Sequence, residues 1–293
     1  MTETNPQQPR VDIVIPVYGE RERALRETLL ACLRQSYPVD RTFVVDDGSP
    51  QAVCLPSEVL PFGPQVVLLR LQQNQGISGA RNAGIAHSNT VLIACVNTEV
   101  IPDSGWLGVC VRYLCANARV GACYTRLVPS RPKRLLTRWR MRFRETKFGS
   151  VSGPTPFAPG HAAVFRREAL DAVGGFDVRY RLHLEDSDLG GRMWQKGWET
   201  HYIAESCCVT TQEDTLTQIA KKELRECFWY AAPGSSPVRS AILLTKWTLI
   251  RAARNLAKFR WYFLPVDFAL WAVGLWSLTS EEVKHAFKGS RSS

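Results

Sequence analysis

The chain has 293 residues, of which 45% are hydrophobic and 22% are charged. This balance is typical of a globular protein with an apolar core, and it excludes a mainly disordered, collagen-like or coiled-coil chain. Because 37 Lys and Arg face 27 Asp and Glu, the formal net charge is +10, so we expect an anionic partner: nucleic acid, a phosphate-rich small molecule or an acidic membrane surface.

In chain order, the first half alternates short runs of β-branched and apolar residues with segments of helical spacing. The pattern predicts strands at residues 11–17, 42–45, 66–71 and 91–96, and helices at residues 20–36, 76–87 and 104–116. Strands and helices in alternation favour a parallel sheet with helices on both faces. Ligands of such sheets bind beyond the carboxyl ends of the strands, so the residues after Val17, Val45 and Val96 are candidates for a binding site.

The second half begins with a strongly basic segment, residues 129–147. The pattern then predicts a loop at residues 151–160, short helices at residues 166–173 and 186–196, and short strands at residues 200–203 and 207–210. From Val238 onward we expect a helical, basic and aromatic tail. The N-terminal residues 1–10 are polar and do not have the pattern of a signal peptide.

The nine cysteines are scattered along the chain, and two of them, Cys207 and Cys208, are adjacent. An odd number without paired spacing argues against a disulfide framework and against a zinc site. We therefore expect reduced, mostly buried thiols in a cytosolic protein.

Two motifs of the first half carry residues suited to a nucleotide. Asp46-Asp47-Gly48-Ser49 follows a strand, where carboxylates can accept hydrogen bonds from a base or a ribose. The same sequence is also typical of a turn whose side chains cap the next helix. The segment from Gly76 to Gly84 opens a helix with glycines that allow close backbone approach, and its Arg81 suits a phosphate. The alternative for this segment is packing of the helix against the sheet.

Two further motifs carry oxygen atoms suited to a cation or a proton. Asn97-Thr98-Glu99 follows the fourth predicted strand and is either the site of a hard cation bridging a diphosphate or a surface turn. Glu185, Asp186 and Asp188 open a helix, where the helix dipole favours carboxylates. A carboxylate in this position can also act as a general base that takes a proton from an attacking hydroxyl.

Taken together and in this order, the motifs resemble the family 2 inverting glycosyltransferases over about residues 10–212. The resemblance rests on five matching segments: Pro16-Val17-Tyr18 with Glu20, Val44 to Ser49, Asn74 to Gly84, Gly174-Gly175-Phe176-Asp177, and Glu185 to Arg192. It implies the GT-A fold, an α/β architecture in which a Rossmann-like, nucleotide-binding mixed sheet is flanked by helices. Here a basic, aromatic helical extension follows that fold at the C-terminus.

The resemblance also implies a role for each matching position. Asp186 is expected to be the catalytic base, and Glu185 and Asp188 are expected either to support it or to recognise the acceptor. Gly160 and His161 are expected to line the pocket for the sugar and the acceptor. Contacts with the nucleotide are expected at Pro16, Val17, Tyr18, Glu20, Asp47, Gly76 and Arg81.

The implied reaction moves a sugar from a nucleoside-diphosphate sugar, with UDP or dTDP, to a hydroxyl of a polysaccharide or a lipid-linked acceptor, with inversion at the anomeric carbon. Its transition state resembles an oxocarbenium ion. The family's metal motif is normally Asp-x-Asp, and Asn97-Thr98-Glu99 stands in its place. Either Glu99, with Asn97, anchors Mg²⁺ or Mn²⁺, or basic residues replace the ion.

We expect four parts along the chain. These are a polar tail at residues 1–10, a nucleotide-sugar-binding half at residues 11–128, an acceptor-binding and catalytic half of the same domain at residues 129–212, and a helical region at residues 213–293.

The basic segment 131–147 and the tail combine Lys and Arg with Trp and Phe, a composition typical of a membrane interface. Within the nearly apolar segment 261–278, Pro265 and Asp267 disfavour a full membrane span. We therefore expect peripheral attachment to an anionic surface on the inner, cytoplasmic face of the cell membrane. The alternatives are that the aromatic residues pack onto the catalytic domain or form a dimer interface. No nucleic-acid-binding motif is present, so nucleic acid is not an expected partner.

Two other classes of function are weighed against an active transferase. One is a catalytically weak, glycosyltransferase-like nucleotide-binding or scaffold protein at the membrane, which the altered metal motif favours. The other is a general nucleotide-binding α/β protein without transferase activity. The presence of Asp47, Arg81 and Asp186 argues against the first, and the second predicts nucleotide binding that is insensitive to the sugar and to Asp186.

Overall fold

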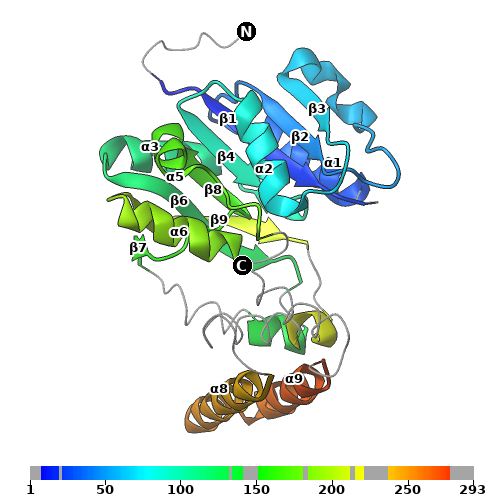
Figure 1. Cartoon of the computed structure of the whole chain (residues 1–293), viewed down its shortest axis with the longest axis vertical. Helices are drawn as coiled ribbons and strands as arrows, with labels where there is room; N and C mark the ends of the chain where they lie inside the picture. Colours follow the sequence, from blue (N-terminus) through cyan, green and yellow to red (C-terminus); the bar gives the residue numbers. More distant parts are fainter. Residues whose placement is uncertain are drawn as a thin grey trace. The chain divides into compact units, whose positions relative to one another are not determined.

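The computed structural model in Figure 1 describes residues 8–19, 22–131, 134–140, 151–180, 184–211, 215–220 and 237–277. The chain divides into two compact units. The first, called the sheet unit, comprises Met1–Ser130 and Phe148–Gln212, and the second, called the helical unit, comprises Arg131–Lys147 and Glu213–Ser293.

The elements of the sheet unit follow the predicted alternation in its first part. In chain order they are β1 (Val11–Val17), α1 (Glu22–Leu33), β2 (Thr42–Asp46), the 3-10 helix η1 (Ser57–Gln65), β3 (Val66–Arg70), α2 (Gly76–His87), β4 (Leu92–Val96), β5 (Val100–Pro102), α3 (Trp106–Ala116), β6 (Val120–Pro129), β7 (Gly153–Thr155), β8 (Ala162–Arg166), α5 (Arg167–Val173), α6 (Glu185–Gln195) and β9 (Glu199–Thr210). The strands and helices predicted up to residue 116 are confirmed, with ends that differ by a few residues at most.

These strands form one mixed sheet in the order β3-β2-β1-β4-β8-β6-β9-β5, with β7 paired to β9. From β3 to β4 neighbouring strands are parallel. Strand β8 then runs antiparallel to both β4 and β6, and β9 is parallel to β6 but antiparallel to β5. The parallel sheet predicted from alternation alone is therefore wrong beyond β4, whereas the mixed sheet implied by the resemblance is confirmed.

Two central strands of this sheet, β6 and β8, were not predicted. Residues 120–129 are rich in Val, Tyr and Thr, and this composition was a signal for a strand. Residues 162–166 form too short an apolar run to be distinguished from the helix that follows. The two short strands predicted near the end of the sheet unit are one continuous strand, β9, whose pairing with β6 shifts register between Thr125 and Arg126.

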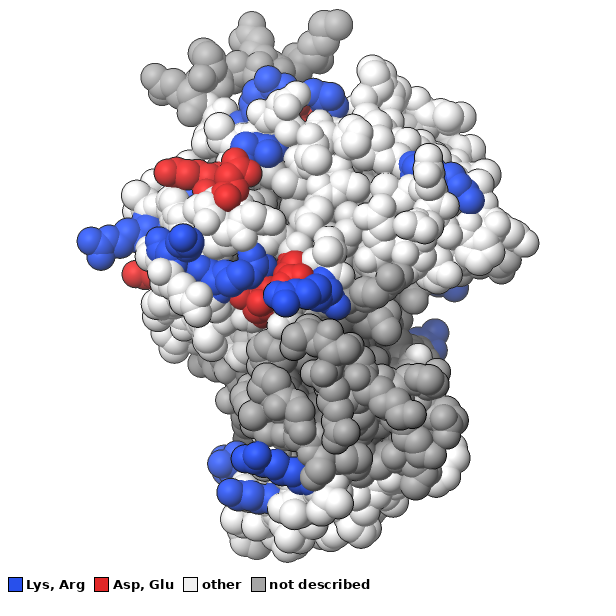
Figure 2. Space-filling model, viewed as in Figure 1, with Lys and Arg blue, Asp and Glu red and all other residues white. Residues whose placement is uncertain are grey.

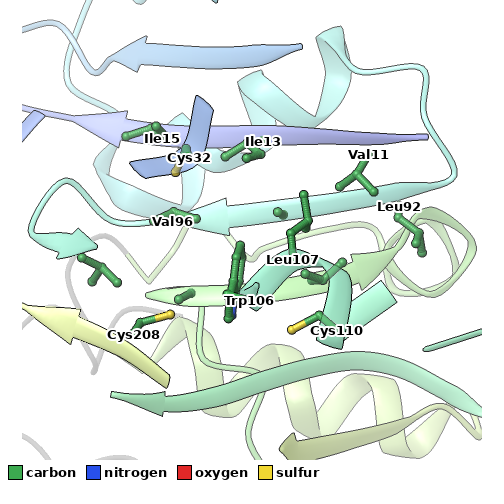
Figure 3. Packing of buried hydrophobic residues seen from close by; sticks show 14 of the residues in the cluster. Val11, Ile13, Ile15, Cys32, Leu92, Val96, Trp106, Leu107, Cys110 and Cys208 are labelled. Atoms are coloured by element: carbon green, nitrogen blue, oxygen red, sulfur yellow. The ribbon is translucent and has the colours of Figure 1, made fainter. Parts of the chain in front are cut away.

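Successive residues of a strand point to opposite faces of the sheet. The strands therefore present apolar side chains on both faces, and helices cover both. On one face, Trp106 of α3 packs in a cluster that includes Ile13 of β1, as Figure 3 shows. On the other face, Val14 of β1 belongs to a second cluster with Leu170 of α5 and Leu189 of α6. Both faces of the sheet therefore carry a buried apolar core.

The helical unit contains helical residues 135–140 and 216–220, followed by α8 (Pro237–Ala257), the 3-10 helix η2 (Trp261–Phe263) and α9 (Leu264–Ser277). The predicted helical tail is thus confirmed for its described part. Nε1 of Trp139 donates a 2.7 Å hydrogen bond to Oδ1 of Asp267, which is fully buried. This contact ties Trp139 to α9, and the predicted limits of the four parts along the chain stay a prediction.

Among the residues that the structure describes, no helix has the length and apolar character needed to cross a membrane. The same residues include eight cysteines, all of them free thiols, and five of these are buried. The expectation of reduced, mostly buried thiols therefore agrees with this part of the chain.

Candidate active site

The predicted motifs meet at the edge of the sheet where the parallel strands β1, β2 and β4 end. Strand β8 is antiparallel to β4, so it begins at the edge where β4 ends. The backbone N–H of Asn97 donates a 2.9 Å hydrogen bond to the carbonyl of His161 across this pair. The antiparallel strand thus brings the segment around residue 160 to the carboxyl edge, which an all-parallel sheet would not do.

Asp46 closes β2 as a buried structural carboxylate. It accepts the backbone N–H groups of Ser49 at 2.9 Å and Val53 at 3.3 Å, and Nη1 of Arg70 at 2.8 Å. Burial by itself would raise the pKa of Asp46, but the hydrogen bonds from Ser49 and Val53, together with the Arg70 charge, lower this pKa below its ordinary value. Asp46 therefore stays ionised and fixes the turn that carries Asp47.

Asp47 caps helix α2 with both of its carboxylate oxygens. Oδ1 accepts the N–H of Gln75 at 2.7 Å, and Oδ2 accepts the N–H of Gly76 at 2.9 Å. Gly76 adopts φ +79°, a conformation that favours glycine. The capping alternative is therefore present in the structure. A carboxylate oxygen can accept a second donor, so the capping bonds leave room for a nucleotide base. The contact of Asp47 with a base stays a prediction.

The loop after β1 contains the other predicted nucleotide contacts. The side chains of Pro16-Val17 are buried in the strand, so a ligand at this edge meets their backbone. Tyr18 is exposed, and the N–H of Gly19 donates a 3.0 Å hydrogen bond to Oγ of Ser49, which joins the loops after β1 and β2. Glu20 lies outside the described residues.

Arg81 of α2 is almost completely buried, with 1% of its surface exposed, and connects the motifs of β4 and α6. Its Nη1 donates to Oε1 of Glu185 at 3.0 Å and lies 3.6 Å from Oδ1 of Asp186. Its Nη2 donates to Oδ1 of Asn97 at 3.0 Å. The guanidinium also lies 5.0 Å from the centroid of the Phe176 ring. Because both Nη atoms are bonded to protein groups, contact of Arg81 with the nucleotide stays a prediction.

Asp186 is the acid of this cluster that solvent reaches, with 32% of its side chain exposed. Its Oδ1 accepts the backbone N–H of Gly160 at 3.0 Å. Desolvation, and then the neighbouring charge of Glu185, raise the pKa of Asp186 to about 7, although Arg81 and the Gly160 hydrogen bond act in the opposite direction. A carboxyl group with this pKa can accept a proton near neutral pH, which a general base requires.

Position 160 lies against this cluster and has no room for a side chain. A Cβ at position 160 would lie 2.3 Å from Cζ of Arg81. The absence of a side chain lets the backbone of Gly160 approach both Arg81 and Asp186. His161 follows, and its ring meets the ring of Tyr124 edge-on at a centroid distance of 6.4 Å.

Asp188 lies one turn into α6 and pairs with Arg192, whose Nε donates to Oδ2 at 2.8 Å. Nη1 of Arg192 in turn donates to the carbonyls of Val173 at 2.6 Å and Gly175 at 2.9 Å. Asp188 therefore anchors α6 to the turn after α5 through Arg192, and its role in catalysis stays a prediction. The residue before α6, Leu184, has φ +76°, a conformation that is strained for a branched side chain.

The residues of the Asn-x-Glu motif provide few ligands for a metal. Oδ1 of Asn97 faces the Arg81 guanidinium, and within the described parts of the chain no group of three or more His, Cys, Asp or Glu side chains could hold a metal ion. Glu99 supplies a carboxylate, which accepts a 3.2 Å hydrogen bond from Oγ1 of Thr98. Because Mg²⁺ is commonly held by one or two carboxylates together with substrate phosphates and water, this set fits a cation that binds together with a diphosphate, with Glu99 as its protein ligand.

The sequence motifs include Ser78 and Asn82 of α2 but assign them no role, and the structure shows that these two residues hold the loop before α6. Nδ2 of Asn82 donates to the carbonyl of Phe176 at 2.7 Å, and the Phe176 N–H donates to Oδ1 of Asn82 at 2.9 Å. One turn earlier, Oγ of Ser78 donates to the carbonyl of Tyr180 at 2.6 Å. Ser78, Arg81 and Asn82 have the spacing i, i+3, i+4, which places them on one face of the helix. Polar residues on one face of a buried helix were the available signal.

Comparison with protein-family models identifies the class to which this fold and site belong. Residues 12–174 match the model of glycosyl transferase family 2, and residues 107–282 match that of glycosyl transferase family group 2. Each match covers more than half of the chain, so the chain belongs to glycosyl transferase family 2. The resemblance seen in the sequence motifs is therefore confirmed at the level of the family.

Curated relatives of the chain include sugar transferases of several kinds. It is 24% identical over 212 residues to the UDP-forming cellulose synthase 1 catalytic subunit of Komagataeibacter xylinus, covering 68% of this chain and 28% of that protein. It is 27% identical over 241 residues to an N-acetylglucosaminyltransferase of Sinorhizobium fredii, covering 74% of this chain and 56% of that protein. The chain spans between 14% and 56% of the length of the curated relatives it matches.

Solved structures show the same fold. The mannosyltransferase PcManGT from Pyrobaculum calidifontis, solved with GDP-Man and Mn²⁺, superposes with a TM-score of 0.59 at 22% identity over 98% of this chain and 81% of that chain. GalNAc-T7, solved with UDP, GalNAc and Mn²⁺, gives 0.58 at 13% identity over 71% of this chain and 44% of that chain. At these identities the likeness establishes the fold, and the GT-A architecture implied by the sequence is confirmed.

Proposed function

We propose that the chain transfers a sugar from a nucleoside-diphosphate sugar to an acceptor hydroxyl, with inversion at the anomeric carbon and with Asp186 as general base. The observation that carries this proposal is the setting of Asp186. Its carboxyl is reached by solvent, has a pKa raised to about 7, and lies beside the buried Arg81–Glu185 pair. Membership of glycosyl transferase family 2 supports the same class of reaction.

In the proposed reaction, Asp186 takes the proton of the acceptor hydroxyl as its oxygen attacks the anomeric carbon. The bond from that carbon to the diphosphate oxygen breaks on the opposite face, and the nucleoside diphosphate leaves with the bonding electrons. Inversion follows from this geometry, and the transition state has oxocarbenium character. Arg81 and Gly160 act by holding Asp186 in place, since both contact its carboxylate.

For the donor we propose a UDP- or dTDP-sugar, held at the carboxyl edge near Tyr18, Asp47 and Gly76. The solved neighbours carry UDP or GDP-Man with Mn²⁺, so a guanine nucleotide belongs in the test. When bound, Mg²⁺ or Mn²⁺ would neutralise charge on the leaving diphosphate, with Glu99 as its protein ligand.

For the acceptor we propose a polysaccharide or a lipid-linked glycan at the cytoplasmic face of a membrane. Two relatives support this class by their names, a cellulose synthase catalytic subunit and an N-acetylglucosaminyl-diphospho-decaprenol L-rhamnosyltransferase of Mycobacterium tuberculosis. The second is 25% identical over 135 residues.

The substitution Asp186→Asn tests the proposal. It removes the base but keeps the oxygen that accepts the Gly160 N–H, so we expect transfer to fall by about 10²–10⁴-fold. Nucleotide binding should persist, measured as thermal shifts with UDP, dTDP and GDP, each with and without Mn²⁺. Asp171→Asn, which changes an exposed acid on α5, is the matched control and should leave both quantities unchanged. Retention of most transfer activity by Asp186→Asn would contradict the role of this residue.

The same measurements distinguish the scaffold alternative. The engagement of Asn97 by Arg81 is the observation that favours it, because it removes one oxygen from the metal motif. A wild-type protein that binds a nucleotide but transfers sugar from none of the matching donors would support the scaffold and overturn the transferase.

A further inference from the structure

The helical unit exposes large apolar side chains to solvent. The most exposed are Phe259 at 89%, Trp261 at 69% and Trp276 at 68%. On α8, five large aliphatic residues are also exposed: Ile250, and the four residues Val238, Ile242, Leu249 and Leu256. At 100° per residue these four lie within about 40° of one another around the helix axis, so they form one stripe. These four residues and the three aromatic ones are called the apolar surface below.

Helix α9 adds to this pattern, because the polar residue in its first turn points inward. Asp267 is fully buried and accepts hydrogen bonds from Trp139 and from Nδ2 of Asn255 at 2.8 Å. Phe268, the next residue, is exposed. An exposed helix face without polar residues is unusual for a surface in water and marks an interaction site.

Phe259 provides a second and independent observation. It follows the C-terminus of α8 with φ +53°, in the left-handed region where glycine or asparagine is usual. The N–H of Arg260 donates to the carbonyl of Asn255 at 2.8 Å, which completes the helix cap around it. A bulky side chain in this conformation costs free energy, and here the ring is almost fully exposed. Contacts within the described chain do not explain why this position carries phenylalanine.

The charge around the apolar surface is of one sign. The described residues of the helical unit contain ten Lys and Arg and a single acid, the buried Asp267. On the face shown in Figure 2, the described surface of this unit carries Lys and Arg and no Asp or Glu. Lys246, Arg254 and Lys258 are exposed on or just after α8. A matching partner therefore presents negative charge beside an apolar layer.

We propose that α8, η2 and α9 bind the surface of a lipid bilayer that contains anionic phospholipids. The apolar surface enters the boundary between headgroups and acyl chains, and the flanking Lys and Arg side chains contact lipid phosphates. Trp prefers this depth, because its ring is apolar while its indole N–H can meet water, and Phe is common on the apolar face of interfacial helices. Helix α8 has 21 residues, about the number that a span requires, but four of them are Lys or Arg, which are costly inside a bilayer. In this proposal α8 therefore lies along the interface.

Other partners fit the same surface less well. A second copy of the chain would bring together two surfaces with many positive charges and no exposed acid among the described residues, which is repulsive. A nucleic acid would use the basic side chains and stack on aromatic rings, but it would leave the aliphatic stripe of α8 unmatched. The anionic bilayer satisfies both the charge and the apolar area. This inference concerns a surface separate from the candidate active site and does not depend on the proposed sugar transfer.

The test measures binding of the purified full chain to vesicles by flotation. One set of vesicles contains phosphatidylcholine alone, and the other contains phosphatidylcholine with about 30% phosphatidylglycerol. We expect partitioning into the anionic vesicles to be at least about ten-fold stronger and to weaken in high salt. Equal binding to both sets, or binding to neither, would overturn the proposal.

The double variant Phe259→Asn/Trp276→Ser tests the residues themselves. Asparagine tolerates the left-handed conformation, so the first substitution leaves folding unharmed or improves it, while vesicle binding falls by about ten-fold or more. Leu60→Ser/Val91→Ser is the matched control, because it removes two exposed apolar side chains of the sheet unit, 73% and 61% exposed. An equal loss in the control would refute the assignment. The assignment would also be refuted if light scattering showed that the lipid-free protein is a dimer, and that Phe259→Asn/Trp276→Ser dissociates this dimer whereas the control variant does not.

Discussion

Two acids and one arginine set the proton affinity of the candidate base. Glu185 and Arg81 form a buried ion pair at 3.0 Å, and Asp186 lies 3.6 Å from the same guanidinium. One positive charge therefore faces two carboxyl groups, and burial makes ionisation of the second one costly. Asn97 contributes a neutral amide oxygen to this cluster, so Nη2 of Arg81 meets an amide and not a further carboxylate.

The substitution Glu185→Gln tests this account of Asp186. It removes a negative charge beside Asp186 while Arg81 remains, so the pKa of Asp186 is expected to fall. A general base is active when deprotonated, so transfer rises with pH through its pKa, and a lower pKa moves the acid limb of the kcat/KM profile to lower pH. At pH 6 the activity of the variant, relative to its own plateau, should rise by up to about ten-fold.

The control for this measurement is Glu168→Gln, which neutralises an exposed acid on α5. Its pH profile should coincide with that of the unchanged protein. An acid limb that stays in place in Glu185→Gln would show that Glu185 does not act on the pKa of Asp186.

At the scale of elements, α2 is the helix on which the site is assembled. Its N-terminus is capped by Asp47 of the β2 loop, and its polar face holds residues 176–180. Gly84 lets the helix approach the sheet, because a Cβ there would lie 2.4 Å from Cγ1 of Val14. The same helix thus positions Arg81 and the loop that leads to α6.

The substitution Asn82→Ala removes both hydrogen bonds between α2 and the backbone of Phe176. We expect the free energy of unfolding to fall by about 1–3 kcal/mol, because two partly buried backbone groups lose their partner. The ring of Phe176 packs on Arg81, so kcat should also fall, and both effects can be measured by denaturant unfolding and steady-state kinetics.

Asn117→Ala is a suitable comparison for that variant. It deletes a 2.8 Å hydrogen bond to the carbonyl of Tyr113 at the end of α3, away from Arg81. It should lower stability but leave kcat unchanged. Loss of kcat in both variants would mean that general destabilisation, and not the clamp on Phe176, explains the effect.

The elements that could be predicted from sequence are those with a strong local pattern. Residues 11–17 are a continuous apolar run and became β1, and the acidic start of α6 marked that helix within one residue. The direction of β8 is not encoded locally, because it depends on a return of the chain to the edge of β4. The motifs identified Asp186 and Arg81 as members of one site, but the burial of Arg81 depends on contacts with Glu185 and Asn97 that are distant in sequence.

At the scale of the whole molecule, the two units have separate cores. The core of the helical unit includes Trp139, Phe263 and Leu270, and Asp267 lies among them as a fully buried carboxylate. Besides its bonds to Trp139 and Asn255, this carboxylate lies 3.4 Å from Nε of Arg251. A buried charge of this kind needs its partners, because their loss leaves it poorly solvated.

Trp139→Phe removes the indole donor to Asp267 and should destabilise the helical unit by about 1–3 kcal/mol. Peptide-resolved hydrogen exchange is expected to become faster in residues 237–277 and to stay unchanged in residues 11–46. Trp198→Phe alters a side chain packed on the core of the sheet unit. In this variant exchange should become faster in residues 11–46 and stay unchanged in residues 237–277. Uniform acceleration in both regions would indicate that the chain unfolds as a single cooperative unit.

The path of the chain between the units limits how they can be separated. The sheet unit is interrupted after β6, because residues 131–147 belong to the helical unit. The chain returns to the sheet unit at Phe148 and passes to the helical unit a second time after β9. The ends of β6 and β9 are neighbours, since Pro129 pairs with Thr210. A truncation after residue 212 would therefore keep Trp139 while removing the buried partners around it. The two units are not exchangeable modules joined end to end, and engineering that separates them needs three cuts in the chain, two of them inside the catalytic fold, on either side of residues 131–147.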